Sequence, residues 1–216
     1  MAETHDLRFR HNASMIIAGP SQSGKTTFIL KLLKHRHLLF DVPLKAVHWY
    51  YGVYQSEVHQ RLSTMGNIHL EEGIPTSFDA IQPYSMIILD DLMTETKASD
   101  ANVTNLFTRV AHHKNSFVIF VTQNLFRKGG DSRTQHLNAQ YLVVFKNPRD
   151  SLQIRVLGSQ MFPGKKNYLT EVYEDATSRP HGYLLIDSHQ ETSNDLRLRT
   201  KLFLDEAPMI AYQAKL

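Results

Sequence analysis

The chain has 216 residues, of which 42% are hydrophobic and 21% charged, and its formal net charge at pH 7 is +3. This length suits one α/β domain with a substantial core and is too short for two full domains. The absence of cysteine excludes disulfides and cysteine-based metal sites and fits a reducing compartment, while the mild positive charge permits a polyanionic partner without requiring one. The sequence opens without an apolar run, and no stretch approaches the ~18 apolar residues of a membrane span, so we expect neither a secretory signal nor membrane association.

Short apolar runs alternate with amphipathic segments along most of the chain. A polar arm or edge segment ends near Asn12, and residues 14–18 (SMIIA) form the first expected strand. Further strands are expected, in chain order, at residues 46–51, 85–90, 117–121 and 141–145. Helices are expected at residues 25–37, 100–114, 151–160 and 168–177, a helix or turn at 54–65, and a terminal hairpin at 183–187 and 197–204. All-apolar strands between amphipathic helices predict a mainly parallel sheet flanked by helices, hence an α/β fold.

A glycine-rich loop follows the first strand. Gly19 to Thr26 read GPSQSGKT, which matches the phosphate-binding pattern GxxxxGK(S/T). Glycines let the backbone wrap around phosphates, and the helix that follows directs its positive end at them. The predicted nucleotide-binding residues are Gly19, Pro20, Ser21, Gln22, Ser23, Gly24, Lys25, Thr26 and Thr27. A strand before the loop and a helix after it favour this interpretation over a turn that binds no ligand.

Two residues of this loop have specific roles. Lys25 is expected to reach the β- and γ-phosphates, and the hydroxyl of Thr26 to bind Mg²⁺. ATP is the expected nucleotide, because the NKxD sequence that accompanies GTP specificity is absent.

Two acids end the apolar run Met86 to Leu89. Asp90 stands where a Walker B carboxylate would hold Mg²⁺, directly or through water, and Asp91 where a side chain would orient and polarise the attacking water. Glutamate is the usual residue in that second role, and aspartate is one methylene shorter. Alone, the pair would be better explained as two solvated acids; the phosphate loop upstream favours the catalytic interpretation.

A polar amide, Gln123, follows the apolar run FVIFV and is placed to contact both the γ-phosphate and the attacking water. The alternative is an amide that only caps the strand, and Asn124 is the second candidate. A positive charge that reaches the γ-phosphate, often from a neighbouring subunit, is supplied best by Arg109 and next by Arg127. The basic segment with Arg127, Lys128 and Arg133 suits contacts with nucleic-acid phosphates or a solvated surface loop.

The ordered set GPSQSGKT, IILDD, a helix with Arg109, FVIFVTQN and YLVVFKNPRDS resembles the FtsK–HerA superfamily of DNA-pumping ATPases. Within it, the chain is similar to the genome-packaging ATPases of poxvirus-like and adenovirus-like viruses and of Polinton-type elements. The resemblance covers residues 14–160. It implies a RecA-like (ASCE) P-loop core of strand order 5-1-4-3-2. Lys25, Asp90, Asp91 and Gln123 then match the Walker lysine, the Walker B acids and the sensor glutamine, and Arg109 the arginine finger.

The same resemblance implies an ATP- and Mg²⁺-dependent motor that translocates double-stranded DNA into a capsid. Its subunits would form a homo-oligomeric ring, a pentamer or hexamer, in the cytoplasm or nucleus of a host cell or in the virion, with capsid or portal vertex proteins as partners. We expect an N-terminal arm over residues 1–13 and a single ATPase domain over 14–216, with a core at 14–160 and a C-terminal extension at 161–216.

Two other classes stay open. A small-molecule kinase would need clustered lid arginines, which the sequence lacks, and the double acid favours water as the nucleophile. A nucleotide-dependent scaffold that does not hydrolyse is disfavoured by the intact set Lys25, Thr26 and Asp90, although the short Asp91 leaves it open.

Overall fold

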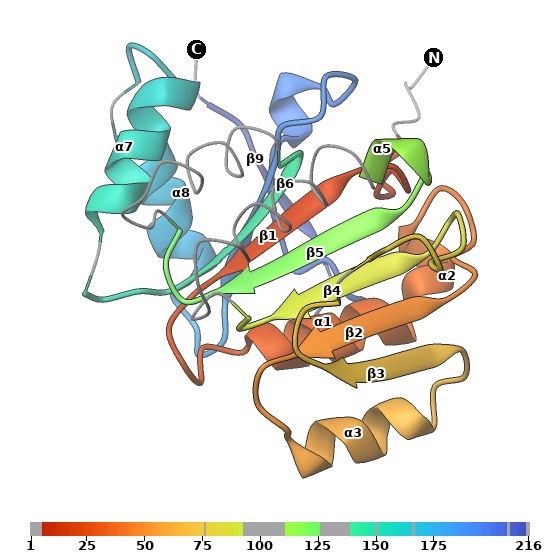
Figure 1. Ribbon diagram of the computed structural model, residues 1–216. Coiled ribbons are helices and arrows are strands. Elements are labelled where there is room, and N and C mark those ends of the chain that lie inside the picture. The colour runs from red at the N-terminus through yellow and green to blue at the C-terminus, as the bar shows by residue number, and fades with distance from the viewer. Residues whose placement is uncertain are drawn as a thin grey trace.

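The computed structural model describes residues 6–75, 77–92, 111–125, 139–149, 151–165, 167–206 and 208–214. Within these ranges, one sheet of nine strands has the order β3-β2-β4-β5-β1-β6-β7-β8-β9 (Figure 1). The strands are β1 Ser14–Ala18, β2 Val47–Tyr51, β3 Ile68–Glu72, β4 Met86–Asp90, β5 Phe117–Thr122, β6 Tyr141–Phe145, β7 Tyr183–Asp187, β8 Leu198–Thr200 and β9 Ile210–Tyr212. The strands from β3 to β6 in this order are parallel, and β7, β8 and β9 continue the sheet antiparallel.

The core strands have the order that the RecA-like interpretation requires. Counted along the chain, β1, β2, β4, β5 and β6 are arranged 5-1-4-3-2, with β1 between β5 and β6. The sheet differs from that minimal order in detail, because β3 is added outside β2 and three antiparallel strands are added beyond β6. The expected terminal hairpin is present as β7 and β8, but it extends the main sheet.

The described helices are α1 Lys25–Lys34, α2 Arg36–Leu39, α3 Ser56–Ser63, α5 Ala111–His113, α7 Leu152–Met161 and α8 Tyr168–Ala176, with 3₁₀ turns at Asn194–Leu196 and Leu204–Glu206. The helix expected over 25–37 is therefore split into α1 and α2. Of the helix expected over 100–114, the structure describes residues 111–114, which are α5 and one turn residue, Lys114. The rest lies outside the described residues.

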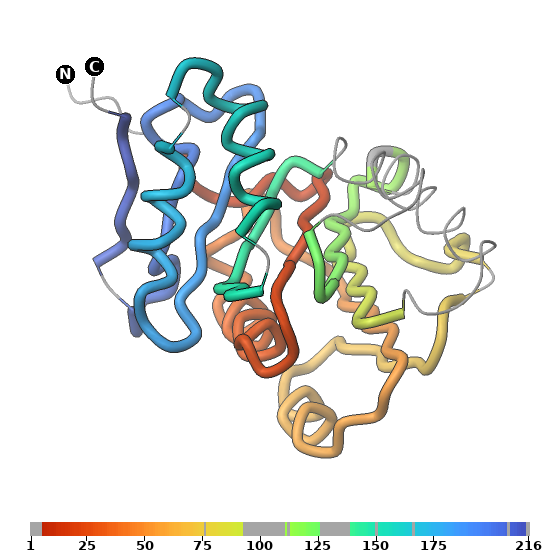
Figure 2. Tube along the Cα trace, turned by 90° about the vertical axis from the view of Figure 1, so that its left-hand side faces the viewer, coloured from red at the N-terminus to blue at the C-terminus, as the bar shows by residue number. Residues whose placement is uncertain are grey.

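Side chains alternate between two cores along each buried strand, as period-two strands require. On β1, Met15 and Ile17 face the core that contains α1 and Leu62 of α3, whereas Ile16 faces the core that contains α7 and α8. Helices therefore cover both faces of the sheet. Figure 2 shows the C-terminal strands, in blue, beside α7 and α8, in cyan.

The segment before β1, expected to be a loose arm or edge segment, is attached to the domain over its described residues. The side chain of Phe9 is only 2% exposed, and its backbone N–H donates to the carbonyl of Leu39 at 2.7 Å. Its ring meets that of Tyr141 edge-on at 4.9 Å between centroids. The apolar side chain of Phe9, in an otherwise polar stretch, explains the attachment.

Among the described residues, none of the helices has the length and apolar character needed to span a membrane.

Candidate active site

The phosphate-loop sequence forms a tight turn between β1 and α1. Gly24, directly before α1, has a φ of 109°, and Gln22 has a φ of 63°, so the loop uses left-handed backbone conformations. A Cβ atom on Gly19 would lie 2.7 Å from both the Cβ of Phe145 and the Oγ of Ser23. Glycine is therefore required at residue 19 as well as at residue 24. The N–H of Gly19 donates to the carbonyl of Thr122 at 3.2 Å and joins the loop to the end of β5.

Polar groups of the loop fit a phosphate ligand. The Oγ of Ser23 is buried and has no hydrogen-bond partner among the described residues. The Nζ of Lys25 donates to the carbonyls of Gly19 at 2.6 Å and Pro20 at 2.9 Å, across the mouth of the loop. Burial lowers the pKa of Lys25, against the charges of Asp91 and Asp90, which raise it. A phosphate oxygen would accept from Lys25 and stabilise the charge that desolvation disfavours.

The two acids lie at the same edge of the sheet as the loop. Asp90 is the last residue of β4, which is separated from β1 by β5. Burial raises the pKa of Asp90 to about 6, and the charge of Asp91 adds to this, while a hydrogen bond from Trp49 and the charge of Lys25 oppose it. Asp90 and the half-buried Thr26 are the residues that would hold Mg²⁺, because a divalent cation favours an ionised carboxylate.

Asp91 and Gln123 lie against each other. Asp91 is exposed and has a φ of 55°, which turns the chain sharply after β4. The Nε2 of Gln123, just beyond β5, donates to the Oδ2 of Asp91 at 3.4 Å. For Asn124, the alternative to Gln123, the backbone N–H donates to the Oγ1 of Thr122 at 3.3 Å in a local turn. Of the two candidate amides, Gln123 is therefore the one whose side chain contacts Asp91.

Four predicted residues cannot be placed: Arg109, Arg127, Lys128 and Arg133 lie outside the described residues. In contrast, the structure adds a residue that sequence reasoning missed. The Nδ1 of His181, in the turn before β7, lies 3.3 Å from the carbonyl oxygen of Ser23 in the phosphate loop. The signal in the sequence is Pro-His-Gly before an apolar strand, which marks a tight turn but not its neighbour.

No protein-family model matches the chain, and no curated protein matches it by sequence. Solved structures do match. The DNA-packaging ATPase B204 from Sulfolobus turreted icosahedral virus is 12% identical, with a TM-score of 0.50 over 85% of this chain and 96% of that chain. The genome packaging NTPase B204 from Sulfolobus turreted icosahedral virus 2, solved in complex with AMPPCP, is 14% identical, with a TM-score of 0.51 over 95% of this chain and 99% of that chain. A complex of the latter with ATP-gammaS is 13% identical, with a TM-score of 0.51. The chain thus has the RecA-like P-loop fold of the B204 viral packaging NTPases.

Proposed function

We propose that this chain hydrolyses ATP and uses the free energy to translocate double-stranded DNA, packaging a viral or virus-like genome into a capsid. The observation that carries the hydrolytic part is the juxtaposition of Lys25, Asp90, Asp91 and Gln123 at one edge of the sheet. The packaging part rests on the fold shared with B204, whose structures are those of a packaging NTPase.

The geometry supports the following roles in hydrolysis. Backbone N–H groups of the loop and the start of α1 bind the phosphates, and Lys25 exchanges its carbonyl partners for phosphate oxygens. Mg²⁺, held by Thr26 and Asp90, would neutralise charge on the phosphate oxygens. Asp91 accepts a hydrogen bond from the attacking water, and the amide of Gln123 fixes Asp91 and reaches the γ-phosphate.

A motor must grip DNA of any sequence, so it needs contacts with the phosphate backbone more than with bases. We assign these contacts to the basic segment with Arg127, Lys128 and Arg133. We further propose a homo-oligomeric ring, a pentamer or hexamer, docked on a capsid or portal vertex protein. In it, Arg109 of one subunit stabilises the transition state at the next.

Steady-state ATP turnover with and without duplex DNA tests the proposal. We expect duplex DNA of arbitrary sequence to stimulate turnover, and Lys25→Ala to reduce it by at least about 10²-fold because a phosphate-binding cation is lost. Lys34→Ala is the matched control, since Lys34 is exposed on the same helix and should leave turnover unchanged. A monomeric protein whose ATP turnover does not change when duplex DNA is added would contradict the proposed motor and favour a small-molecule kinase.

Mixing two inactive variants tests the role of Arg109. Arg109→Ala should bind ATP and fail to hydrolyse it. Mixed with Lys25→Ala, it should regain part of the activity, because some interfaces then combine an intact arginine with an intact loop. Normal hydrolysis by Arg109→Ala alone would remove Arg109 from the mechanism.

A further inference from the structure

We propose that the pocket between the phosphate loop and the turn at residues 177–182 holds the nucleoside part of the nucleotide, with His181 as the residue that contacts it. This inference rests on the proposed ATP site and adds to it a subsite built from the C-terminal extension.

The direction of the triphosphate points to this side of the loop. In the sheet order β4-β5-β1-β6-β7, Asp90 and Gln123 lie at the ends of β4 and β5, on one side of the loop that follows β1. The γ-phosphate must lie there, next to the metal and water ligands. The nucleoside, at the other end of the phosphate chain, therefore lies on the side of the loop where β6 and β7 are.

Two segments meet the loop on that side. β6 is parallel to β1, so Lys146 follows β6 at the same edge of the sheet as the loop. β7 is antiparallel to β6, so the turn at 177–182 precedes β7 at this edge too. Gln22 and Ser23 of the loop, Lys146 and residues 177–182 line a cavity of about 340 Å³. A pocket thus lies where the phosphate geometry requires the nucleoside.

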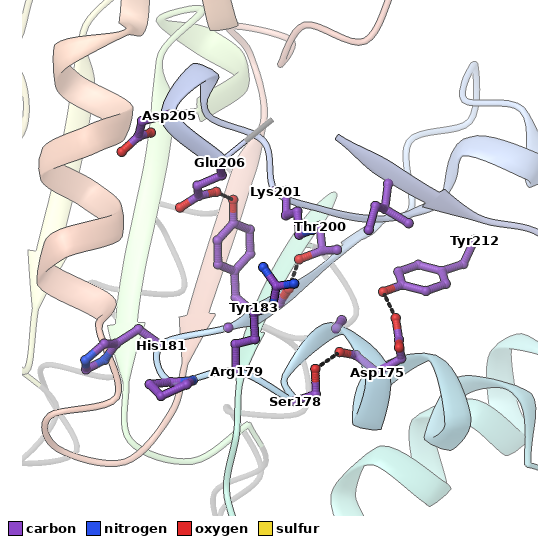
Figure 3. Close-up of a pocket in the computed structure, with 14 residues that line it drawn as sticks. Asp175, Ser178, Arg179, His181, Tyr183, Thr200, Lys201, Asp205, Glu206 and Tyr212 are labelled. Carbon is purple, nitrogen blue, oxygen red and sulfur yellow. Dashed lines mark hydrogen bonds between the residues drawn. The ribbon is translucent and has the colours of Figure 1, made fainter. Parts of the chain in front are cut away.

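Charge distinguishes this cavity from its larger neighbour. Its lining includes the cations Lys146 and Arg179 and contains no carboxylate, so it does not repel the α-phosphate to which the nucleoside is attached. The neighbouring cavity, of about 530 Å³, shares Arg179 and His181 with it and also contains Lys201, but three carboxylates line it as well, those of Asp175, Asp205 and Glu206 (Figure 3). Those acids accept from Tyr212 and Lys31, at 2.6 to 2.8 Å. The larger cavity is thus the poorer site for a nucleotide.

The turn is built to hold His181 against the loop. The N–H of Gly182 donates to the carbonyl of Arg179 at 3.0 Å, Pro180 is second in the turn, and His181 has a φ of 60°. This is a type II turn, which normally has glycine or asparagine at the third position. A histidine in this conformation carries backbone strain that glycine would not.

The ring of His181 is oriented by the loop itself. Its Nδ1 can only donate to the carbonyl of Ser23, 3.3 Å away, which leaves Nε2 as an acceptor in the neutral ring. In Figure 3 the ring turns toward the start of α1, while Asp175 and Tyr212 lie on the opposite side of the larger pocket. The exposed imidazole is therefore available to a base or ribose beside Gly24.

Calorimetric titration with Mg·ATP and with magnesium tripolyphosphate separates this subsite from the phosphate site. We expect the wild-type chain to bind ATP more tightly than tripolyphosphate. His181→Gly should weaken ATP binding about 3- to 10-fold, the range of one aromatic contact, and leave tripolyphosphate binding unchanged. Glycine suits the turn, so the thermal midpoint should not fall. The control His113→Gln changes an exposed histidine before β5, at the opposite edge of the sheet, and should alter neither affinity.

An unchanged preference for ATP over tripolyphosphate in His181→Gly overturns the subsite and leaves the phosphate site standing. Equal losses of affinity for ATP and for tripolyphosphate also overturn it, because His181 would then affect only the conformation of the phosphate loop. If the wild-type chain binds neither ligand, the proposed ATPase fails and this inference falls with it.

Discussion

Asp90, the proposed Mg²⁺ ligand, shows how a residue of the candidate site can carry a cost to stability. Its pKa of about 6 in the folded chain exceeds the ordinary value of 3.8 because burial disfavours the carboxylate. The stabilising effect of this carboxyl group is therefore fully present below about pH 4 and is lost as the pH rises through about 6. Above that pH, the folded state holds a buried carboxylate whose charge water would solvate better in the unfolded chain.

Asp90→Asn should therefore stabilise the metal-free protein at alkaline pH. We expect a gain of about 1–2 kcal/mol at pH 8, which raises the melting temperature by about 2–8 °C and vanishes near pH 4. Calorimetry in a chelator at both pH values measures it, and Asp195→Asn, at an exposed residue, is the control. Equal effects at the two pH values would show that the carboxyl is not destabilised by burial. The same variant should lose Mg²⁺-dependent turnover.

Asp91 and Gln123 are expected to act on turnover, with little effect on binding. Asn tolerates the left-handed backbone of residue 91, so Asp91→Asn removes the charge without distorting the turn. We expect kcat to fall by about 10²- to 10⁴-fold in Asp91→Asn and by a smaller factor in Gln123→Ala, with the Kd of ATP nearly unchanged. Single-turnover rates and equilibrium titration separate the two quantities. Retained turnover in Asp91→Asn would transfer the role to another group.

At the scale of elements, a buried ion pair joins β7 to β8. The Nη2 of Arg199 lies 2.6 Å from the Oδ2 of Asp187, and their side chains are only 2% and 5% exposed. Arg199 also donates to the carbonyl of Leu7, at 3.2 Å, and so connects the segment before β1 to the last strands.

Removing one partner of this pair should cost far more than removing both. Arg199→Met leaves the Asp187 carboxylate buried and unpaired, and we expect the free energy of unfolding to fall by about 3–5 kcal/mol. The double variant Arg199→Met, Asp187→Leu should recover much of this loss, because no buried charge remains. Urea denaturation of the single and double variants measures both values. A double variant that is no more stable than Arg199→Met would show that the contact of Arg199 with Leu7, and not the pair, dominates.

The sequence predicted the position of a strand correctly where the local run of apolar residues determines it. The strands β1, β4, β5 and β6 are almost entirely apolar because both faces are covered, and each coincides with its expected range within a residue or so. β3, with the sequence IHLEE, was missed because it lies at the edge of the sheet, is only partly buried and acquires its strand conformation by pairing with β2. β8 is shorter than expected because Lys201 follows it with a φ of 56°.

The same distinction between local sequence and long-range strand pairing decides which site residues could be predicted. Lys25, Asp90 and Gln123 were predictable as neighbours because parallel strands bring their carboxyl ends to one edge of the sheet. His181 was not, since its place beside Ser23 depends on β7 pairing antiparallel with β6, which no local pattern specifies.

At the scale of the whole molecule, the C-terminal extension is continuous with the core. Leu184, Leu185 and Ile186 of β7 are fully buried, and they alternate between the two cores of the sheet. β7 also covers the free edge of β6, the strand beside the phosphate-loop strand. The extension therefore completes the fold in addition to contributing the turn beside the loop.

Two truncations test this continuity. A chain that ends at Gln160 lacks α8 and the strands β7 to β9. It would expose the edge of β6 and the apolar surfaces that β7 covers, so we expect aggregation and no cooperative thermal transition. A chain that ends at Glu206 loses only β9 and nearby residues, and those of them that the structure describes are half-buried or exposed. It should melt cooperatively a few degrees lower, because the hydrogen bond from Tyr212 to Asp175 is lost. If the chain that ends at Gln160 melts cooperatively and still binds ATP, the core is stable without the extension.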